Sequence, residues 1–209
     1  MLERMRNRLR RSNDKGFTLI EMAIVLIIIG IIIGAVIKGK DVIKGAEQKK
    51  LYTKFVREWQ IAYNNYYDRT GYILGDDASD DNAIRNGQCN PAATAGNLEA
   101  QLKRVGLTPP SEGPTGSSLV RTYTDSLGVQ RTITLAFDYN ATIGNFMRIA
   151  GVSNDLGMAW DKIVDDIMDG TEGELKYAAD YTAPATNIAW PSAETAPTAT
   201  AAAIVSLEF

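Results

Sequence analysis

The chain has 209 residues, enough for one membrane segment and one modest globular domain. It contains no histidine and one cysteine, which excludes Ser-His-Asp and Cys-His catalytic arrangements and an internal disulfide. Residues 1–16 carry six basic and two acidic side chains, a net charge of +4, whereas the whole chain carries −3, so residues 17–209 carry −7. This acidic remainder argues against a general nucleic-acid-binding surface.

Residues 17–37 form an apolar run of 21 residues between the basic leader and Lys38. A run of this length predicts a transmembrane helix. The basic leader, residues 1–16, favours a cytoplasmic position for the N-terminal end of this helix. We therefore expect the residues after Ile37 to lie on the opposite side of the membrane. A secretory signal peptide is disfavoured, because its apolar core is shorter and ends at a small-residue cleavage site.

One carboxylate, that of Glu21, lies inside this apolar run. A charge within a bilayer costs about 2.5–3.5 kcal/mol on insertion scales, and a plain membrane anchor does not account for it. Cleavage between Gly16 and Phe17 would create a new α-amino group, the one nearby cation able to pair with Glu21. Pairing between copies would also fix the axial offset of neighbouring helices. On this interpretation Glu21 acquires its partner only after the cut.

The segment Gly16-Phe17-Thr18-Leu19-Ile20-Glu21 resembles the processing site of type IV pilins and of the pseudopilins of type II secretion. The resemblance implies that a prepilin peptidase cuts after Gly16 and methylates Phe17, and that Glu21 then neutralises the amine of a neighbouring subunit. It implies three kinds of partner: copies of this chain or related pilins in a helical filament, the peptidase, and an inner-membrane assembly platform. Many pilins also have a proline in this helix and a C-terminal disulfide; the chain has neither.

The helix is predicted to continue beyond the membrane. Apolar residues recur there at spacings of three and four, which indicates an amphipathic helix over residues 38–69. The clearest stripe is Leu51, Phe55, Trp59, Ala62 and Tyr66. Gly71 is the predicted stop signal.

Four aspartates follow within six residues: Asp76, Asp77, Asp80 and Asp81. Carboxylate oxygens in a loop are candidate calcium ligands. The spacing lacks the glycine and the final glutamate of an EF-hand loop, so a solvated acidic loop is the favoured interpretation. We expect no other cofactor.

The remaining sequence predicts short helices and strands. Asn97 is the expected N-cap of a helix that ends at Arg104, with Gly106 after it. A second helix is expected over residues 154–168 and is ended by Gly170. Strands are expected over residues 119–125, 131–139, 174–177 and 203–209, and the apolar C-terminal tail should pair within the sheet.

These elements predict a pilin-like α+β fold. One long N-terminal helix, transmembrane in its first half, packs on a small antiparallel sheet with one or two short helices. The expected segments are a leader (1–16), a transmembrane half (17–37), an amphipathic half (38–69) and a globular head (70–209). The predicted function is a structural subunit, not an enzyme. It is expected in the inner membrane with the head in the periplasm before assembly, and in an extracellular or periplasmic filament afterwards.

Other functions are compatible with the same sequence. A type II secretion pseudopilin or a minor pilin shares the same processing motif. A non-polymerising, membrane-anchored binding domain is less favoured, because the head shows no polar constellation. A nucleic-acid-binding pilin would need a basic patch, for which the candidates are Lys103, Arg104, Arg121 and Arg131. The acidic balance is against it, and we expect no nucleic-acid partner.

Overall fold

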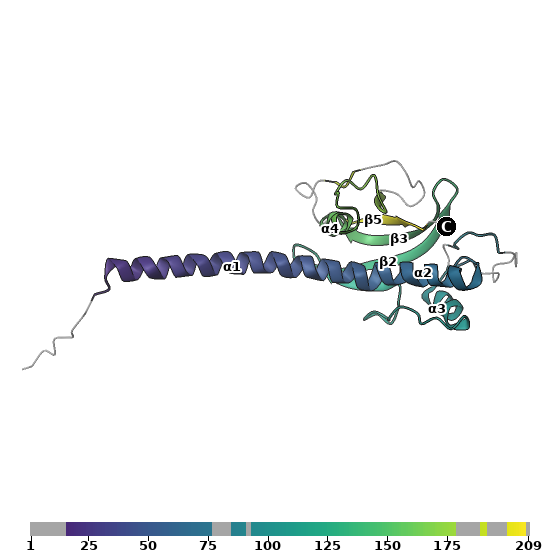
Figure 1. Cartoon of the computed structure of the whole chain (residues 1–209), viewed down its shortest axis with the longest axis horizontal. Helices are drawn as coiled ribbons and strands as arrows, with labels where there is room; N and C mark the ends of the chain where they lie inside the picture. The colour runs from purple at the N-terminus through teal and green to yellow at the C-terminus, as the bar shows by residue number, and fades with distance from the viewer. Residues whose placement is uncertain (1–15, 77–84, 91–92, 179–188, 192–199, 208–209) are drawn as a thin grey trace, which may run out of the picture. The chain divides into compact units, whose positions relative to one another are not determined.

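A computed structural model describes residues 16–76, 85–90, 93–178, 189–191 and 200–207 (Figure 1). The chain divides into two compact units, Met1–Lys44 and Gly45–Phe209. The boundary falls within the first helix, and each unit is described separately below.

The described part of the first unit is helical from Leu19 onward. This helix, α1 (Leu19–Leu51), contains no buried residue. Its large apolar side chains from Leu19 to Ile43 are exposed, from 92% at Leu19 to 41% at Met22. Among the described residues, the helical stretch that begins with α1 is the one long and apolar enough to cross a membrane.

The second unit begins where the helix becomes amphipathic. A π-helical turn, η1 (Tyr52–Val56), follows α1 and leads into α2 (Arg57–Thr70). The predicted apolar stripe is confirmed, but the π-helical turn was not predicted. Tyr52, Phe55 and Val56 are all buried in this turn. The helix ends as predicted at Gly71, which adopts φ +70° and donates its N–H to the Tyr67 carbonyl at 2.7 Å.

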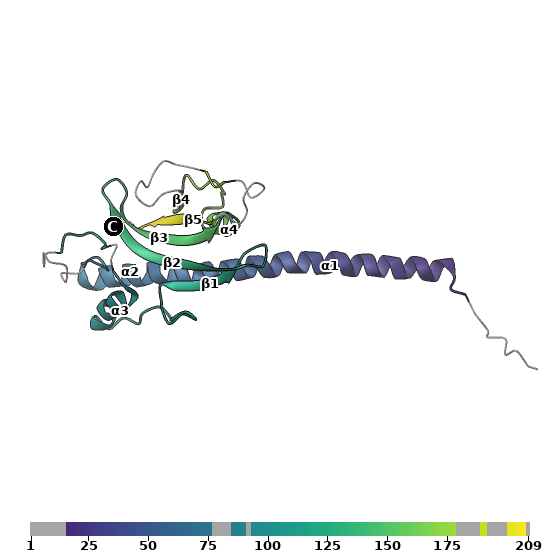
Figure 2. The same ribbon diagram turned by 180° about the vertical axis from the view of Figure 1, so that it is seen from behind.

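Five antiparallel strands form one sheet in the order β1-β2-β3-β5-β4 (Figure 2). They are β1 (Val120–Thr124), β2 (Gln130–Asn140), β3 (Gly144–Ser153), β4 (Leu175–Ala178) and β5 (Thr200–Ser206). The predicted pairing of the C-terminal tail within the sheet is confirmed, because β5 pairs with both β3 and β4; it starts three residues earlier than predicted. Strand β3 was missed, because its glycines and polar residues weaken the strand pattern.

Two short helices accompany the sheet, and both differ from the prediction at one end. In α3 (Ala95–Arg104) the N-cap is Thr94, whose hydroxyl accepts the Asn97 N–H, so the assignment of Asn97 as the cap was wrong. Helix α4 (Asn154–Asp165) ends three residues early. There the Asp165 carboxylate accepts the N–H groups of Glu174 and Leu175, which turns the chain toward β4.

The core of the second unit lies between the helix and the sheet (Figure 1). Trp59 packs edge-to-face on Phe137 at a centroid distance of 5.7 Å, and Tyr63 stacks on the same ring at 5.6 Å. The Trp59 indole N–H donates to the Ser118 carbonyl at 2.9 Å. From α4, Trp160 donates to the Gln48 carbonyl at 3.0 Å. The predicted pilin-like α+β fold is confirmed.

Candidate functional site

The start of α1 is organised by a reciprocal pair, Thr18 and Glu21. The Glu21 Oε2 atom accepts the Thr18 N–H at 2.8 Å and the Thr18 hydroxyl at 2.7 Å. In return, the Thr18 hydroxyl accepts the Glu21 N–H at 3.3 Å. This arrangement is a capping box, which satisfies two N–H groups that a helix start leaves without partners.

The capping box changes the interpretation of Glu21. The sequence predicts a partner for this carboxylate only after cleavage, whereas in the uncut chain the carboxylate is already bonded to Thr18. Both of these bonds go to Oε2, and within the described residues no hydrogen bond reaches Oε1. One carboxylate oxygen therefore remains able to accept a further donor. The Thr-x-x-Glu spacing could have revealed the capping box from sequence alone.

The bond between Gly16 and Phe17 precedes the helix in exposed, non-helical chain. The Phe17 side chain is 79% exposed. A Cβ atom added to Gly16 would meet nothing within 4 Å. The fold of this chain therefore places no steric demand for glycine at position 16, so any such demand must come from a partner that acts on this bond.

The apolar helix that follows lacks a covering surface in a single chain. Its side chains are apolar on every face from Met22 to Ile37, and none is buried. A helix that is apolar all round is normally covered by lipid or by other helices. This N-terminal helix fits the membrane anchor of a pilin.

Of the four candidate calcium ligands, only Asp76 lies within the described residues; Asp77, Asp80 and Asp81 do not. The Asp76 side chain is buried, and its carboxylate accepts the N–H groups of Asn86 at 3.3 Å and Gly87 at 2.8 Å. Asp76 thus holds the backbone of residues 86 and 87 in place. No group of three metal-ligating side chains occurs among the residues that the structure describes, and the calcium loop remains a prediction.

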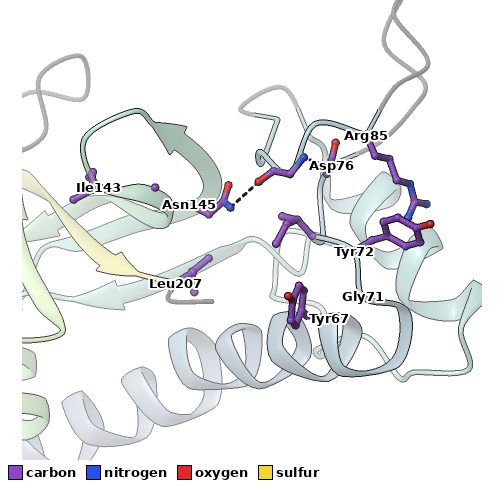
Figure 3. A pocket seen from close by; sticks show the side chains of 11 residues that line it. Tyr67, Gly71, Tyr72, Asp76, Arg85, Ile143, Asn145 and Leu207 are labelled. Carbon is purple, nitrogen blue, oxygen red and sulfur yellow. Dashed lines mark hydrogen bonds between the residues drawn. The ribbon is translucent and has the colours of Figure 1, made fainter.

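A groove of about 740 Å³ lies in the head near the end of α2 (Figure 3). The Arg85 guanidinium stacks over the Tyr72 ring at 4.0 Å on one side. On the other side, the Asn145 amide donates to the Gly87 carbonyl and accepts the Cys89 N–H. Because Asp76 and Asn145 are engaged with the backbone of residues 86–89, these polar groups support the chain and form no nucleophile–base pair.

The basic candidates for nucleic-acid binding mostly have partners inside the head. Arg121 donates to the carbonyls of Ser111, Ser117 and Val120. Arg131 pairs with Asp125 at 2.8 Å, and Lys103 pairs with Glu99 at 3.7 Å. Three of the four side chains thus make local contacts, whereas Arg104 has no hydrogen bond or ion pair with the residues that the structure describes.

Comparison with known proteins identifies the N-terminal segment. Residues 11–37 match the family model of the prokaryotic N-terminal methylation motif, the signature of type IV pilins and pseudopilins. The motif and the pilin-like fold support a type IV pilin-like or pseudopilin protein. No curated protein and no solved structure matched the chain.

Proposed function

We propose that this chain is a structural subunit of a type IV pilus or pilus-like filament, cleaved after Gly16 by a prepilin peptidase and assembled through its N-terminal helix. The observation that carries the proposal is the Thr18–Glu21 capping box, which lies inside the methylation motif at the start of a helix with no buried side chain. A plain membrane anchor does not account for a carboxylate inside its apolar run.

Cleavage hydrolyses the amide between Gly16 and Phe17. It releases residues 1–16, with a net charge of +4, and leaves a free amine on Phe17. The exposed, non-helical chain at this bond supports the step, because a peptidase must bind extended backbone. Methylation of the Phe17 amine is what the family motif implies.

Assembly then uses Glu21 as an acceptor. Thr18 holds Oε2, and Oε1 is available to the Phe17 amine of a neighbouring copy. Phe17 and Glu21 are four residues apart, so an intersubunit pair sets an axial offset of about 6 Å at 1.5 Å per residue. The ion pair reduces the cost of placing a carboxylate at membrane depth.

The apolar helix supplies the filament core. Neighbouring helices cover the side chains that a single chain leaves exposed, from Leu19 to Ile37. Gly30 and Gly34 have the small-xxx-small spacing that lets helices approach closely, and a Cβ at either position would meet nothing within the chain. The single chain therefore offers space for a close neighbour there.

The partners in this proposal are copies of the chain or related pilins, the peptidase and the inner-membrane assembly platform. Before assembly, the helix spans the inner membrane with the head in the periplasm. A pseudopilin of type II secretion or a minor pilin shares the same motif and remains the alternative. Imaging of the source cells separates these cases, because a pilus gives long extracellular filaments.

Mass spectrometry of the mature N-terminus tests the proposal. We expect a chain that starts at Phe17 and carries one methyl group. The variant Gly16→Val should stay uncut with an unchanged head, since position 16 has no neighbour within 4 Å. An intact Met1 start, or a cut elsewhere, would contradict the proposal.

A second measurement tests Glu21. The variant Glu21→Ala should still be cut after Gly16 but should fail to form filaments. Glu47→Ala, a change at an exposed acidic residue farther along the same helix, is the matched control. Normal assembly of Glu21→Ala would remove the physical basis of the pairing.

A further inference from the structure

The end of α4 carries exposed apolar side chains beside acidic ones. Ile163, Ile167 and Met168 are 39%, 59% and 53% exposed. Residues 165–174 contain five acidic side chains and no basic one. The Asp165 carboxylate binds the N–H groups of Glu174 and Leu175, which brings the end of this segment next to α4. We call the surface formed by Ile163, Asp166, Ile167, Met168 and Glu172 the acidic-apolar patch.

The fold uses three of the five acidic side chains of residues 165–174. Asp165 and Asp169 accept backbone N–H groups, and Glu174 pairs with Arg57 at 3.6 Å. In contrast, Asp166 and Glu172 are exposed, and their side chains have no recorded hydrogen bond or ion pair within the described residues. An apolar centre with acidic groups beside it resembles the anatomy of a protein interface.

A complementary surface occurs on α1 just after the apolar run. We call residues 38–44 the basic helix segment. It contains Lys38, Lys40 and Lys44 and one acidic residue, Asp41. Between the lysines, Val42 is 73% exposed and Ile43 is 61% exposed. This segment therefore also combines exposed apolar side chains with charge, but the charge is of the opposite sign.

The two surfaces reflect a segregation of charge along the whole chain. Residues 38–70 contain eight basic and four acidic side chains, a net charge of +4. Residues 71–209 contain eight basic and eighteen acidic side chains, a net charge of −10. The helix of one copy and the head of another thus attract each other, which favours this relative arrangement of copies over head against head.

We propose that the acidic-apolar patch of one subunit binds the basic helix segment of a second copy of the chain. The proposal rests on the proposed function, since it needs copies held side by side. In its own chain α4 lies level with Gln48 and Tyr52, which Trp160 contacts. A second copy displaced outward by about 6–15 Å brings its residues 44 to 38 to that level, at 1.5 Å per residue. The lysines thus come from the copy that lies farther from the membrane.

Cysteine crosslinking between two differently tagged full-length chains tests this contact. One chain carries Ile43→Cys and the other Ile167→Cys, and both are expressed together in cells that process the protein. Cys89 can stay in place, because the residue is 2% exposed and burial raises the pKa of its thiol to about 12. A mild oxidant accepts the two electrons and two protons as the two thiols form the disulfide.

We expect a dimer that contains both tags. The matched control replaces Ile167→Cys by Leu127→Cys, a residue that is 69% exposed at the β1–β2 turn, and should give no such dimer. Ile24→Cys in both chains reports contact between the N-terminal helices. If the 24–24 dimer forms without the 43–167 dimer, the present inference is overturned and the proposed function stands. If neither forms and the chain is uncut, the proposed function fails.

Charge exchange tests the electrostatic part. Glu172→Lys, or Lys40→Glu, should lower the yield of the 43–167 dimer several-fold, and the two together should restore it. Glu112→Lys, the same change at an exposed acidic residue outside the patch, should leave the yield unchanged. Equal loss with Glu112→Lys, or no rescue by the pair, contradicts a specific contact. Lysines that instead bind anionic lipid headgroups would show no response to Glu172→Lys, which also overturns the proposal.

Discussion

The two units of the chain differ in the exposure of their apolar side chains. In α1, the large side chains from Leu19 to Ile37 are exposed, and not one residue of the helix is buried. In the head, Trp59, Phe137 and Trp160 are almost completely buried and contact one another or the backbone. The first unit carries a recognisable motif but little internal packing. The head carries dense packing, and no comparison recognises it.

This difference suggests that stability and assembly are separable in this protein. Side chains that fill a core determine the free energy of unfolding of the head. Side chains that a single chain leaves uncovered contribute only when lipid or another copy covers them. Variants in the two units should therefore affect different measurements.

The largest expected effect is that of Trp59→Ala on the head. It removes a side chain with no exposed surface, its contact with Phe137 and its hydrogen bond to Ser118. We expect a loss of about 3–5 kcal/mol in the free energy of unfolding. Urea unfolding of the full chain in detergent, followed by tryptophan fluorescence and near-UV circular dichroism, measures it.

Ile28→Ala is the matched change in the first unit. Ile28 is 49% exposed, so we expect a change within about 0.5 kcal/mol for unfolding of the head. If Ile28→Ala destabilises the head as much as Trp59→Ala does, stability and assembly are not separable in this protein.

The next largest effect concerns Gly151. This residue lies at the register shift between β3 and β5, has φ +80°, and a Cβ there would lie 2.3 Å from the Thr132 carbonyl oxygen. We expect Gly151→Ala to cost about 2–4 kcal/mol, from backbone strain and overpacking together. Gly128 has φ +82° but an open surrounding, so Gly128→Ala isolates the strain at about 1–2 kcal/mol. If Gly151→Ala and Gly128→Ala lower the free energy of unfolding equally, the close contact with Thr132 adds no destabilisation of its own.

These positions also show what the sequence could predict. The helix, its stop at Gly71 and four of five strands followed from apolar spacing and glycine, which are local signals. Three features depend on the segments that pack against them: strand β3, the register shift at Gly151 and the π-helical turn at Tyr52. The residues next to each feature in the sequence do not indicate those packing partners. At the candidate site, residue spacing identified Gly16, Phe17 and Glu21 as candidates, and the same spacing contained the Thr18 cap. The groove beside Tyr72 is lined by segments that lie far apart in the sequence, so local sequence patterns could not predict it.

A smaller effect is expected from pH, through Asp125 at the β1–β2 turn. Burial raises the pKa of this carboxyl, but donors from Arg131 and the N–H groups of Val129 and Leu127 outweigh it and hold the pKa below its ordinary value. The native state thus binds the proton less readily than the unfolded state. The contribution of Asp125 is complete above the unfolded pKa, near 3.9, and is lost as the pH falls through the native pKa.

Urea midpoints measured between about pH 7 and pH 3 test this. Asp125→Asn should lower the midpoint near neutrality and flatten its fall in acid. Asp161 gives the opposite sign, because burial raises its pKa, so acidification through its range adds stability. An unchanged acid slope in Asp125→Asn would assign the slope to other carboxyl groups.

The smallest expected effect is that of Thr18→Val at the start of α1. The change keeps the shape of the side chain but removes the hydroxyl that donates to Glu21 and accepts its N–H. Loss of such a cap costs about 1 kcal/mol of local helix stability. Faster amide exchange should therefore appear at residues 19–22, while the urea midpoint of the head stays the same. Thr18→Ser retains the hydroxyl and should exchange like the native chain.

The value of Thr18→Val lies in what it does to assembly. If the hydroxyl orients Glu21 toward a neighbouring amine, filament yield should fall several-fold although the charge of Glu21 remains and the peptidase still cuts after Gly16. If the yield is normal while exchange at residues 19–22 rises, Thr18 is only a helix cap and Glu21 finds its partner without it. Both outcomes leave the head unchanged, so a shift in the urea midpoint of the head on this methyl-for-hydroxyl exchange would show that the two units are coupled.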